Sequence, residues 1–262
     1  MIPKIIHYCW FGRNPLPPLA KKCIKSWKKH CPDYEIIEWN EDNFDIASAP
    51  LYVRQAYEAK KWAFVTDYVR LYVVHEHGGI YLDTDVELIK NLDEVLDAKG
   101  FFAFENGRYI ATGLGFGAEK GSLLVREMMD VYTSISFIQE DGSFDTTPCP
   151  GRNTDVLIKH GLKQDDSLQY IDGHMIYPHD WFCPCSWRTG ELCKTQNTLG
   201  IHWFSSSWYD SAKKATKNFE AKRIKRINRR HYIKTLPNRI LMSVLGNKAY
   251  AHLKEFLKKR EK

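Results

Sequence analysis

The sequence predicts an α/β fold, and three observations support this prediction. Short apolar segments typical of strands alternate with amphipathic segments typical of helices near the N-terminus. A longer helical pattern then leads through two glycines into an apolar strand. The composition is globular, with 44% hydrophobic and 27% charged residues in a chain of 262. That length is enough for one substantial core or two small ones, and the composition argues against a disordered chain.

The first three elements are a strand, a helix and a second strand. Residues 4–11 are rich in β-branched and aromatic side chains and end at a glycine and a proline cluster, which predicts a strand followed by a loop. Apolar residues recur every fourth position in 19–29, which predicts a helix, and 34–39 follows as a strand. This alternation is typical of a mostly parallel sheet.

The next element is predicted to be one long helix over residues 51–77. Its apolar side chains recur at the spacing of a single helical face. Asp67 and Arg70 lie three positions apart in it, so they are expected to point the same way. Two glycines after the last residue of this pattern predict the end of the helix.

Two carboxylates, Asp83 and Asp85, directly follow the apolar strand predicted for residues 80–82. Open α/β sheets bind ligands at the carboxyl ends of their strands. Two carboxylates at this spacing can bind a hard divalent cation, which usually shares its remaining positions with water and substrate phosphate. Because the D-x-D spacing alone is common, the prediction depends on its setting of helix, paired glycines and strand.

Shorter elements are expected over the rest of the body. They are a strand at 101–105, a helix at 121–133, a Gly/Pro-rich loop at 141–153, strand-like pieces within 168–187 and a late strand at 199–204.

The C-terminal part of the chain has a very different charge from the rest. Residues 211–262 contain 17 Lys and Arg and three acids, a net of +14 within an overall charge of +6. We expect a body over 1–210 and a basic amphipathic helical extension over 211–262 that meets an anionic partner. Helix-turn-helix, RNP and zinc-finger patterns are lacking, so we expect a membrane surface and no nucleic acid.

The remaining composition bears on the compartment. The sequence has no run of about 18 apolar residues, and its first residues lack the apolar region of a signal peptide, so a cytoplasmic location is expected. The seven cysteines form no regular framework, which favours reduced thiols. Whether Cys183, Cys185 and Cys193 bind zinc stays open, because the usual paired spacing is missing.

Two sequence blocks resemble a known family. AFVTDYVR (63–70) and HGGIYLDTD (77–85) are similar to the sugar-binding region of the DXD-containing glycosyltransferases of family 32. That family is related to yeast initiating mannosyltransferases and more distantly to the glucosylating domains of clostridial toxins. Further matches, in the same order, are residues 2–12, Trp27, 32–35, Trp39, His202-Trp203 and Ser207-Trp208.

The resemblance implies a GT-A-type, Rossmann-like nucleotide-sugar-binding domain over 1–210. It also implies a retaining hexosyltransferase that uses Mn²⁺ or Mg²⁺ and moves a hexose from a nucleotide diphosphate sugar to the hydroxyl of a saccharide or lipid-linked saccharide. Capsular or other surface polysaccharide biosynthesis, on the inner face of the cytoplasmic membrane, is the expected setting. The donor stays open between UDP-galactose, UDP-glucose, UDP-N-acetylglucosamine and GDP-mannose.

The same resemblance assigns roles to residues of the DXD region. Asp85 is expected to be the main metal ligand, and Asp83 to contact the ribose and sugar of the donor while supporting the metal through water. Asp67 and Arg70 match positions that hold sugar hydroxyls, and Tyr81 matches one beside the diphosphate.

Residues from the two ends of the body complete the implied site. Trp10 matches an aromatic residue that stacks on the nucleotide base, with Ile6 and His7 in the same pocket. The late segment that completes metal and diphosphate coordination is matched by His202, Ser207 and Trp208.

Two alternatives accompany this interpretation. DTDVE (83–87) after an apolar strand also partly fits the opening motif of haloacid-dehalogenase-type phosphatases and phosphotransferases, in which Asp83 is the nucleophile. About 80 residues precede the motif here, and no G-D-x-x-x-D follows, which disfavours that alternative. The loop at 148–153 resembles the glycine-bearing acceptor loop of family 32 and is equally consistent with an ordinary surface turn.

Overall fold

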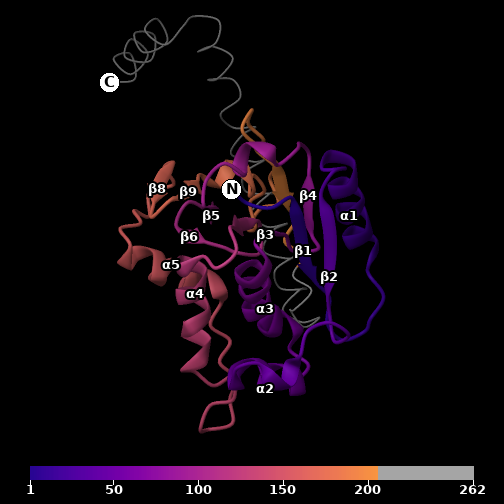
Figure 1. Cartoon of the computed structure of the whole chain (residues 1–262), viewed down its shortest axis with the longest axis vertical. Coiled ribbons are helices and arrows are strands. Elements are labelled where there is room, and N and C mark those ends of the chain that lie inside the picture. The colour runs from indigo at the N-terminus through magenta and orange to yellow at the C-terminus, as the bar shows by residue number, and fades with distance from the viewer. Residues whose placement is uncertain (206–262) are drawn as a thin grey trace, which may run out of the picture. The chain divides into compact units, whose positions relative to one another are not determined.

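The computed structural model describes residues 1–205 (Figure 1). Nearly all of them belong to one compact unit, Met1–Trp187 with Glu191–Trp208. The predicted extension over 211–262 lies outside the described residues, as does its boundary with the body. No helix within residues 1–205 is long and apolar enough to cross a membrane.

The centre of the molecule is an eight-stranded mixed sheet. Its strands are β1 (Ile5–Cys9), β2 (Glu35–Trp39), β3 (Gly79–Tyr81), β5 (Gly100–Glu105), β6 (Tyr109–Ile110), β7 (Phe116–Ala118), β8 (Gln169–Ile171) and β9 (His174–Tyr177). Their order is β2-β1-β3-β7-β5-β9-β8, with β6 paired to β5. β2, β1 and β3 run parallel, as do β5 and β9, whereas β7 is antiparallel to both of its neighbours.

A second sheet has two antiparallel strands, β4 (Val86–Leu88) and β10 (Gly200–His202). β4 follows directly after the two predicted site aspartates, and β10 comes more than a hundred residues later. This small sheet therefore brings the late part of the body next to the end of β3.

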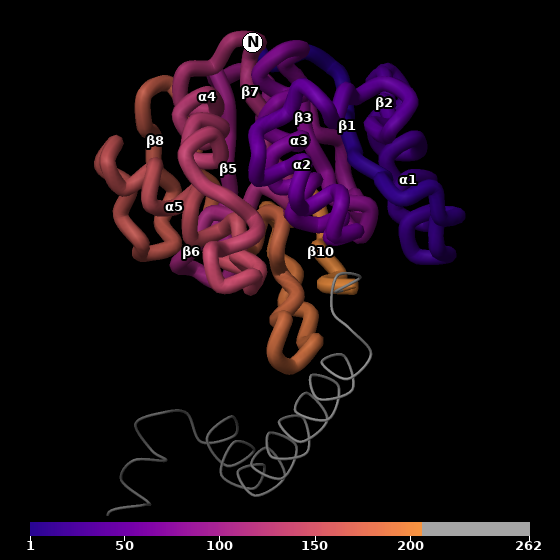
Figure 2. The backbone as a smooth tube through the Cα atoms, turned by 90° about the horizontal axis from the view of Figure 1, so that it is seen from below, coloured from indigo at the N-terminus to yellow at the C-terminus, as the bar shows by residue number. Residues whose placement is uncertain are grey.

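The helices lie on both faces of the large sheet. They are α1 (Pro18–His30), α2 (Leu51–Glu58), α3 (Trp62–His77), α4 (Leu123–Asp130) and α5 (Cys149–Lys159), with short 3₁₀ turns η1 (Ile46–Ser48), η2 (Asp93–Val95), η3 (Val131–Thr133) and η4 (His179–Trp181). α3 packs on β1 and β3 and is flanked by α2 and α4 (Figure 2). α1 packs against β4 (Figure 1).

Side chains of the sheet alternate between two separate cores. On β5, Phe102 and Phe104 join the core under α2, α3, α4 and α5, whereas Phe101 and Ala103 join the core that contains Trp27 of α1. A sheet covered by helices on both faces confirms the predicted α/β class.

Two boundaries differ from the sequence prediction. The single helix predicted over 51–77 is wrong: α2 ends at Glu58, and Lys60 turns the chain with φ 56° before α3 begins. Ala59, Lys60 and Lys61 are residue types that favour helix, so nothing in the local sequence marks this break. The loop predicted over 141–153 ends at Pro148, because Pro150 is tolerated in the first turn of α5.

The end of α3 determines where the two aspartates lie. Gly78 caps the helix with φ 70°, and its N–H donates to Val74 O at 2.8 Å. Gly79 enters β3 so close to β1 that a Cβ atom there would lie 2.8 Å from Ile5 O. The predicted stop at two glycines is confirmed, and it leads the chain into a strand whose carboxyl end carries Asp83.

Candidate active site

Asp83 and Asp85 lie in the turn between β3 and β4. The N–H of Asp83 donates to Gly113 O at 2.9 Å, and the N–H of Val86 donates to Asp83 O at 2.9 Å, which closes the turn. Asp85 is buried, with 8% of its surface exposed. One of its carboxylate oxygens, Oδ2, accepts the backbone N–H of Ser205 at 2.7 Å.

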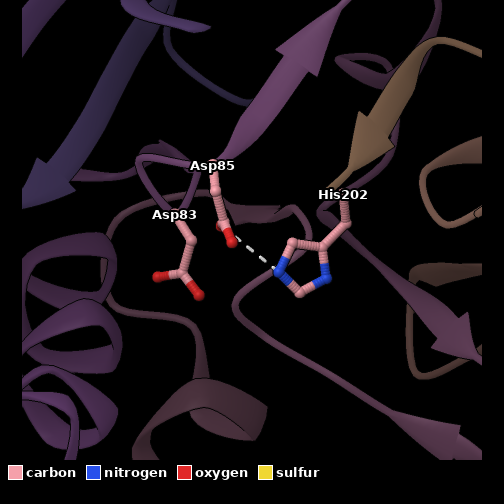
Figure 3. A group of neighbouring side chains, drawn as sticks. All are labelled: Asp83, Asp85 and His202. Atoms are coloured by element: carbon pink, nitrogen blue, oxygen red, sulfur yellow. Dashed lines mark ion pairs between the residues drawn. The ribbon is translucent and has the colours of Figure 1, made fainter. Parts of the chain in front are cut away.

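The second oxygen of Asp85 faces a histidine from the end of β10. Asp85 Oδ1 lies 3.3 Å from His202 Nε2. Figure 3 marks this pair with a dashed line. Asp83, Asp85 and His202 each offer a ligand atom, and these atoms lie within 4.8 Å of one another. Two carboxylates and an imidazole form a donor set that a divalent cation such as Mn²⁺ accepts.

Electrostatics couple Asp85 and His202. Burial disfavours the charged form of Asp85, but the facing His202 and the bonds from Ser205 outweigh it and hold the pKa of Asp85 below its ordinary value. Burial likewise opposes protonation of His202, yet the Asp85 carboxylate raises the pKa of His202 well above its ordinary value. Nδ1 of His202 is buried without a hydrogen-bond partner in the described part of the chain.

A second cluster centres on Arg70. Its Nη2 lies 3.2 Å from Asp67 Oδ1 and 3.4 Å from Asp83 Oδ1, so one guanidinium joins the two carboxylates. Thr66 fixes the same guanidinium by accepting from Nε at its backbone oxygen and from Nη2 at its hydroxyl. Burial raises the pKa values of Asp67 and Asp83, against the opposing charge of Arg70. The predicted common face of Asp67 and Arg70 is confirmed.

Tyr81 completes the link between this cluster and the DXD turn. Its hydroxyl donates to Asp83 Oδ1 at 3.0 Å, and the guanidinium of Arg70 lies 5.2 Å from its ring centroid. Only 1% of Tyr81 is exposed, and burial raises the pKa of its phenol. The Tyr81 phenol therefore stays neutral and orients the Asp83 carboxylate by donating a hydrogen bond to it.

Sequence reasoning missed two residues in the wall of this cluster. Cys149, the first residue of α5, has its Sγ 3.6 Å from Arg70 Nη1 and also hydrogen-bonds Asp67. Gly113 lies so close that a Cβ atom there would be 2.2 Å from Asp83 Oδ2. The resemblance of loop 148–153 to an acceptor loop was the only signal that pointed to the region of Cys149.

The residues predicted to bind the base lie on and after β1. Ile6 is fully buried in the core that contains Trp27. His7 is also fully buried, with Nε2 bonded to Gly78 O at 2.8 Å and Nδ1 to Trp39 Nε1 at 3.1 Å. These partners favour a structural role for His7 in joining β2, β1 and β3.

Other predicted residues have different positions. Trp10 is half-buried, and its indole N–H donates to Asn14 O. Ser207 and Trp208 lie outside the described residues. All seven cysteines are free thiols in the structure. Within residues 1–205 the one side-chain group that could hold a metal is Asp83, Asp85 and His202, so zinc binding at Cys183, Cys185 and Cys193 gains no support.

The chain is similar in sequence to known glycosyltransferases. The family described as a glycosyltransferase sugar-binding region containing a DXD motif matches residues 17–102. An uncharacterized glycosyltransferase of Acanthamoeba polyphaga mimivirus is 32% identical over 202 residues, which cover 70% of this chain and 78% of the viral protein.

Two further similarities cover less. Inositol phosphoceramide mannosyltransferase 3 of Schizosaccharomyces pombe is 34% identical over 99 residues, 36% of this chain, and the match spans only 27% of that enzyme's length. The solved PaToxG glycosyltransferase aligns with a TM-score of 0.49 and 19% identity, covering 60% of this chain and 69% of the other. None of these matches points to the haloacid-dehalogenase alternative.

Proposed function

The chain belongs to the glycosyltransferases whose sugar-binding region contains a DXD motif, and we propose that it transfers a hexose from a nucleotide diphosphate sugar to a hydroxyl of a saccharide or lipid-linked saccharide. The observation that carries the proposal is the approach of Asp83, Asp85 and His202 to within 4.8 Å of one another at the carboxyl end of β3. The Asp67–Arg70 pair lies beside them, joined through Asp83.

Asp85, Asp83 and His202 would hold the divalent cation, Mn²⁺ or Mg²⁺. His202 Nε2 and Asp85 Oδ1 already face one another, and Ser205 occupies only the other oxygen of Asp85. When bound, such a cation offsets the negative charge that develops on a diphosphate leaving group.

Arg70 and Asp67 are proposed to bind hydroxyls of the donor sugar. Because Arg70 is fixed by Thr66 and by two carboxylates, it does not need to reorganise when the donor enters. The pairing of both Asp67 and Asp83 with Arg70 favours binding roles over nucleophilic attack on the sugar. We therefore propose retention by a front-face route, in which an oxygen of the leaving diphosphate accepts the proton of the acceptor hydroxyl.

The donor assay tests this proposal. Purified full-length protein is incubated with UDP-galactose, UDP-glucose, UDP-N-acetylglucosamine and GDP-mannose, each with Mn²⁺, and slow hydrolysis of the donor is measured. We expect hydrolysis of one donor, its loss in excess chelator and its recovery when Mn²⁺ is restored. Hydrolysis of no donor, or full activity in chelator, would contradict the proposal.

We also propose that the protein attaches peripherally to an anionic membrane surface and works in capsular or surface polysaccharide assembly. The support for membrane attachment is the net charge of +14 in residues 211–262. Each basic residue near an anionic leaflet contributes about 1 kcal/mol to the free energy of binding. Full-length protein should float with anionic liposomes, and a chain ending at Asp210 should not. Equal flotation of the two would contradict the role of the basic segment.

A further inference from the structure

The strand that carries His202 is short, and its position depends on contacts beyond its own ladder. β10 has three residues and pairs with β4, also of three residues. An isolated two-stranded pair of this size is marginally stable in water. Two backbone bonds to the segment around η4 also hold β10: Leu199 N–H donates to Trp181 O, and His202 N–H donates to Phe182 O. These bonds fix the backbone of β10 up to His202 but not the residues that follow it.

Beyond β10, residues 203 and 205 are bonded to the DXD turn and to β4. Trp203 donates its backbone N–H to Asp85 O at 3.0 Å, and Ser205 donates its own to Asp85 Oδ2 at 2.7 Å. The indole N–H of Trp203 donates to Glu87 Oε2 at 2.9 Å. The first two bonds end on Asp85, which would hold the cation, whereas the third ends on Glu87 of β4.

The register of the small sheet explains this third bond. Ile201 lies opposite Glu87, so Trp203, two residues further on, is diagonal to Glu87 and on the same face. Val86 and Leu88 are buried on the other face. Glu87 is therefore directed away from the core and toward Trp203.

Helix α1 fixes the position of Glu87 from the side opposite β10. Lys22 Nζ lies 2.7 Å from Glu87 Oε2 and 5.4 Å from the ring centroid of Trp203. Trp27 Nε1 donates to Val86 O at 2.7 Å, and Ser26 Oγ accepts from Leu88 N at 2.9 Å. β4 is thus bonded to α1 along its length.

We propose that Glu87 and Trp203 are positioning residues that hold His202 at the metal centre, a role that rests on the proposed function. Neither belongs to the three residues that offer ligand atoms to a cation. Their bond links the segment after β10 to the α1–β4 unit, so His202 and the Ser205 amide stay at Asp85 before a cation arrives. Groups that orient metal ligands typically change metal affinity by 10- to 100-fold when they are removed.

The test measures Mn²⁺ affinity by calorimetric titration of the full-length protein. Trp203→Phe keeps an aromatic ring but removes the indole N–H donor. Glu87→Ala removes the carboxylate that accepts from it. We expect each to weaken Mn²⁺ binding roughly tenfold, and the double variant to weaken it no further than either single variant, because both remove the same bond. The control Glu94→Gln changes an exposed acid on η2 and should leave the affinity unchanged.

A second measurement uses metal-free protein and does not depend on activity. Amide hydrogen exchange of residues 200–205 should be faster in Trp203→Phe and Glu87→Ala than in wild type, with exchange in β1 and β5 unchanged. Glu87→Gln, which keeps an acceptor oxygen for the indole, should recover much of the protection. This milder variant keeps the test valid where Glu87→Ala fails to fold.

The outcomes separate this inference from the proposed function. Wild-type Mn²⁺ affinity and wild-type exchange in Trp203→Phe would overturn the positioning role. If wild type binds no Mn²⁺, or if Asp85→Asn binds it as tightly as wild type, the proposed metal centre fails. The exchange rates of residues 200–205 still decide in that case whether the Glu87–Trp203 bond holds this segment.

Discussion

The candidate site has two halves that are built in different ways. The Asp67–Arg70–Asp83 half comes from α3 and the end of β3, within one continuous sequence block. Asp67 and Arg70 are buried, Asp83 is half-buried, and both carboxylates pair with Arg70. The Asp85–His202 half joins residues more than a hundred positions apart through a two-stranded sheet. The first half rests on the large core, whereas the second rests on a small number of hydrogen bonds.

This difference suggests a division of labour. A guanidinium held by Thr66 and two carboxylates suits the recognition of hydroxyls, which requires fixed geometry. His202, at the end of the short strand β10, suits the proposed role of a third metal ligand beside the two aspartates. Substitutions in the two halves should therefore impair the protein in different ways and to different extents.

The largest effect is expected for Asp85→Asn, in the second half. The amide can still accept the Ser205 N–H, but it removes the charge that pairs with His202 and would bind the cation. We expect donor hydrolysis to fall about 1,000-fold, equivalent to about 4 kcal/mol. The fold should persist with a lower temperature of unfolding, because the buried Asp85–His202 pair is lost. Asp97→Asn, at an exposed acid, serves as the control. Substantial remaining hydrolysis would show that the second half is dispensable.

The next effect tests how firmly the first half is built into the sheet. Trp39 Nε1–H can only donate and Gly78 O can only accept, so His7 between them must be neutral, with its proton on Nε2. Burial, together with the nearby His77, lowers the pKa of His7 to about 4. The folded state thus binds fewer protons at His7 than the unfolded state between pH 6.5 and 4.

The folded state should therefore lose stability as the pH is lowered from 6.5 to 4. Acidification from pH 6.5 to 4 should cost the wild type about 3 kcal/mol relative to His7→Gln, which can still donate to Gly78 O but does not titrate. Urea unfolding at several pH values measures the difference between the two proteins. A difference that stays constant across the window would show that His7 is not held neutral by these partners.

The first half was largely predictable from sequence, for a physical reason. Asp67 and Arg70 are placed by helical periodicity, and Gly78 and Gly79 are the residues that a sharp helix-to-strand turn requires. These are local rules that apply within about 20 residues. The approach of Asp85 to this half follows from the same chain segment.

The remaining contacts were not predictable, because they depend on tertiary packing. His202 was placed at the metal by resemblance, but its support by Glu87 depends on the register of β4 and β10, two strands too short to give a sequence pattern. The sequence pointed to Cys149 only as part of the loop 148–153. Its place beside Arg70 results from the start of α5, which the flanking prolines and glycine concealed.

A third prediction concerns space in the first half. Gly113 has no unusual φ, so Gly113→Ala strains no backbone, but its Cβ would lie 2.2 Å from Asp83 Oδ2 and 3.1 Å from Arg70 Nη1. Moving these groups should lower kcat/KM for donor hydrolysis roughly thirtyfold, or about 2 kcal/mol, mainly through KM. Gly117→Ala is the contrast, since its Cβ would meet the Phe101 ring and Gly79 O and should cost stability instead. Equal stability losses in the two variants would remove the distinction.

The smallest effect is expected at Cys149, where the first half meets α5. Its thiol hydrogen-bonds Asp67 and its sulfur accepts weakly from Arg70 Nη1, while burial and the Asp67 carboxylate raise its pKa and keep it protonated. Cys149→Ala leaves Asp67 without this donor, which should raise the donor KM about fivefold, or about 1 kcal/mol.

Cys149→Ser restores a hydroxyl donor and should recover most of the loss. Cys31→Ala, at a buried thiol just after α1 and outside the site, should leave the donor KM unchanged even where it lowers stability. The comparison isolates the hydrogen bond from the packing of a buried sulfur. If serine and alanine at 149 behave alike, the thiol only fills space, and the fixed geometry of the first half comes from Thr66 and Arg70 alone.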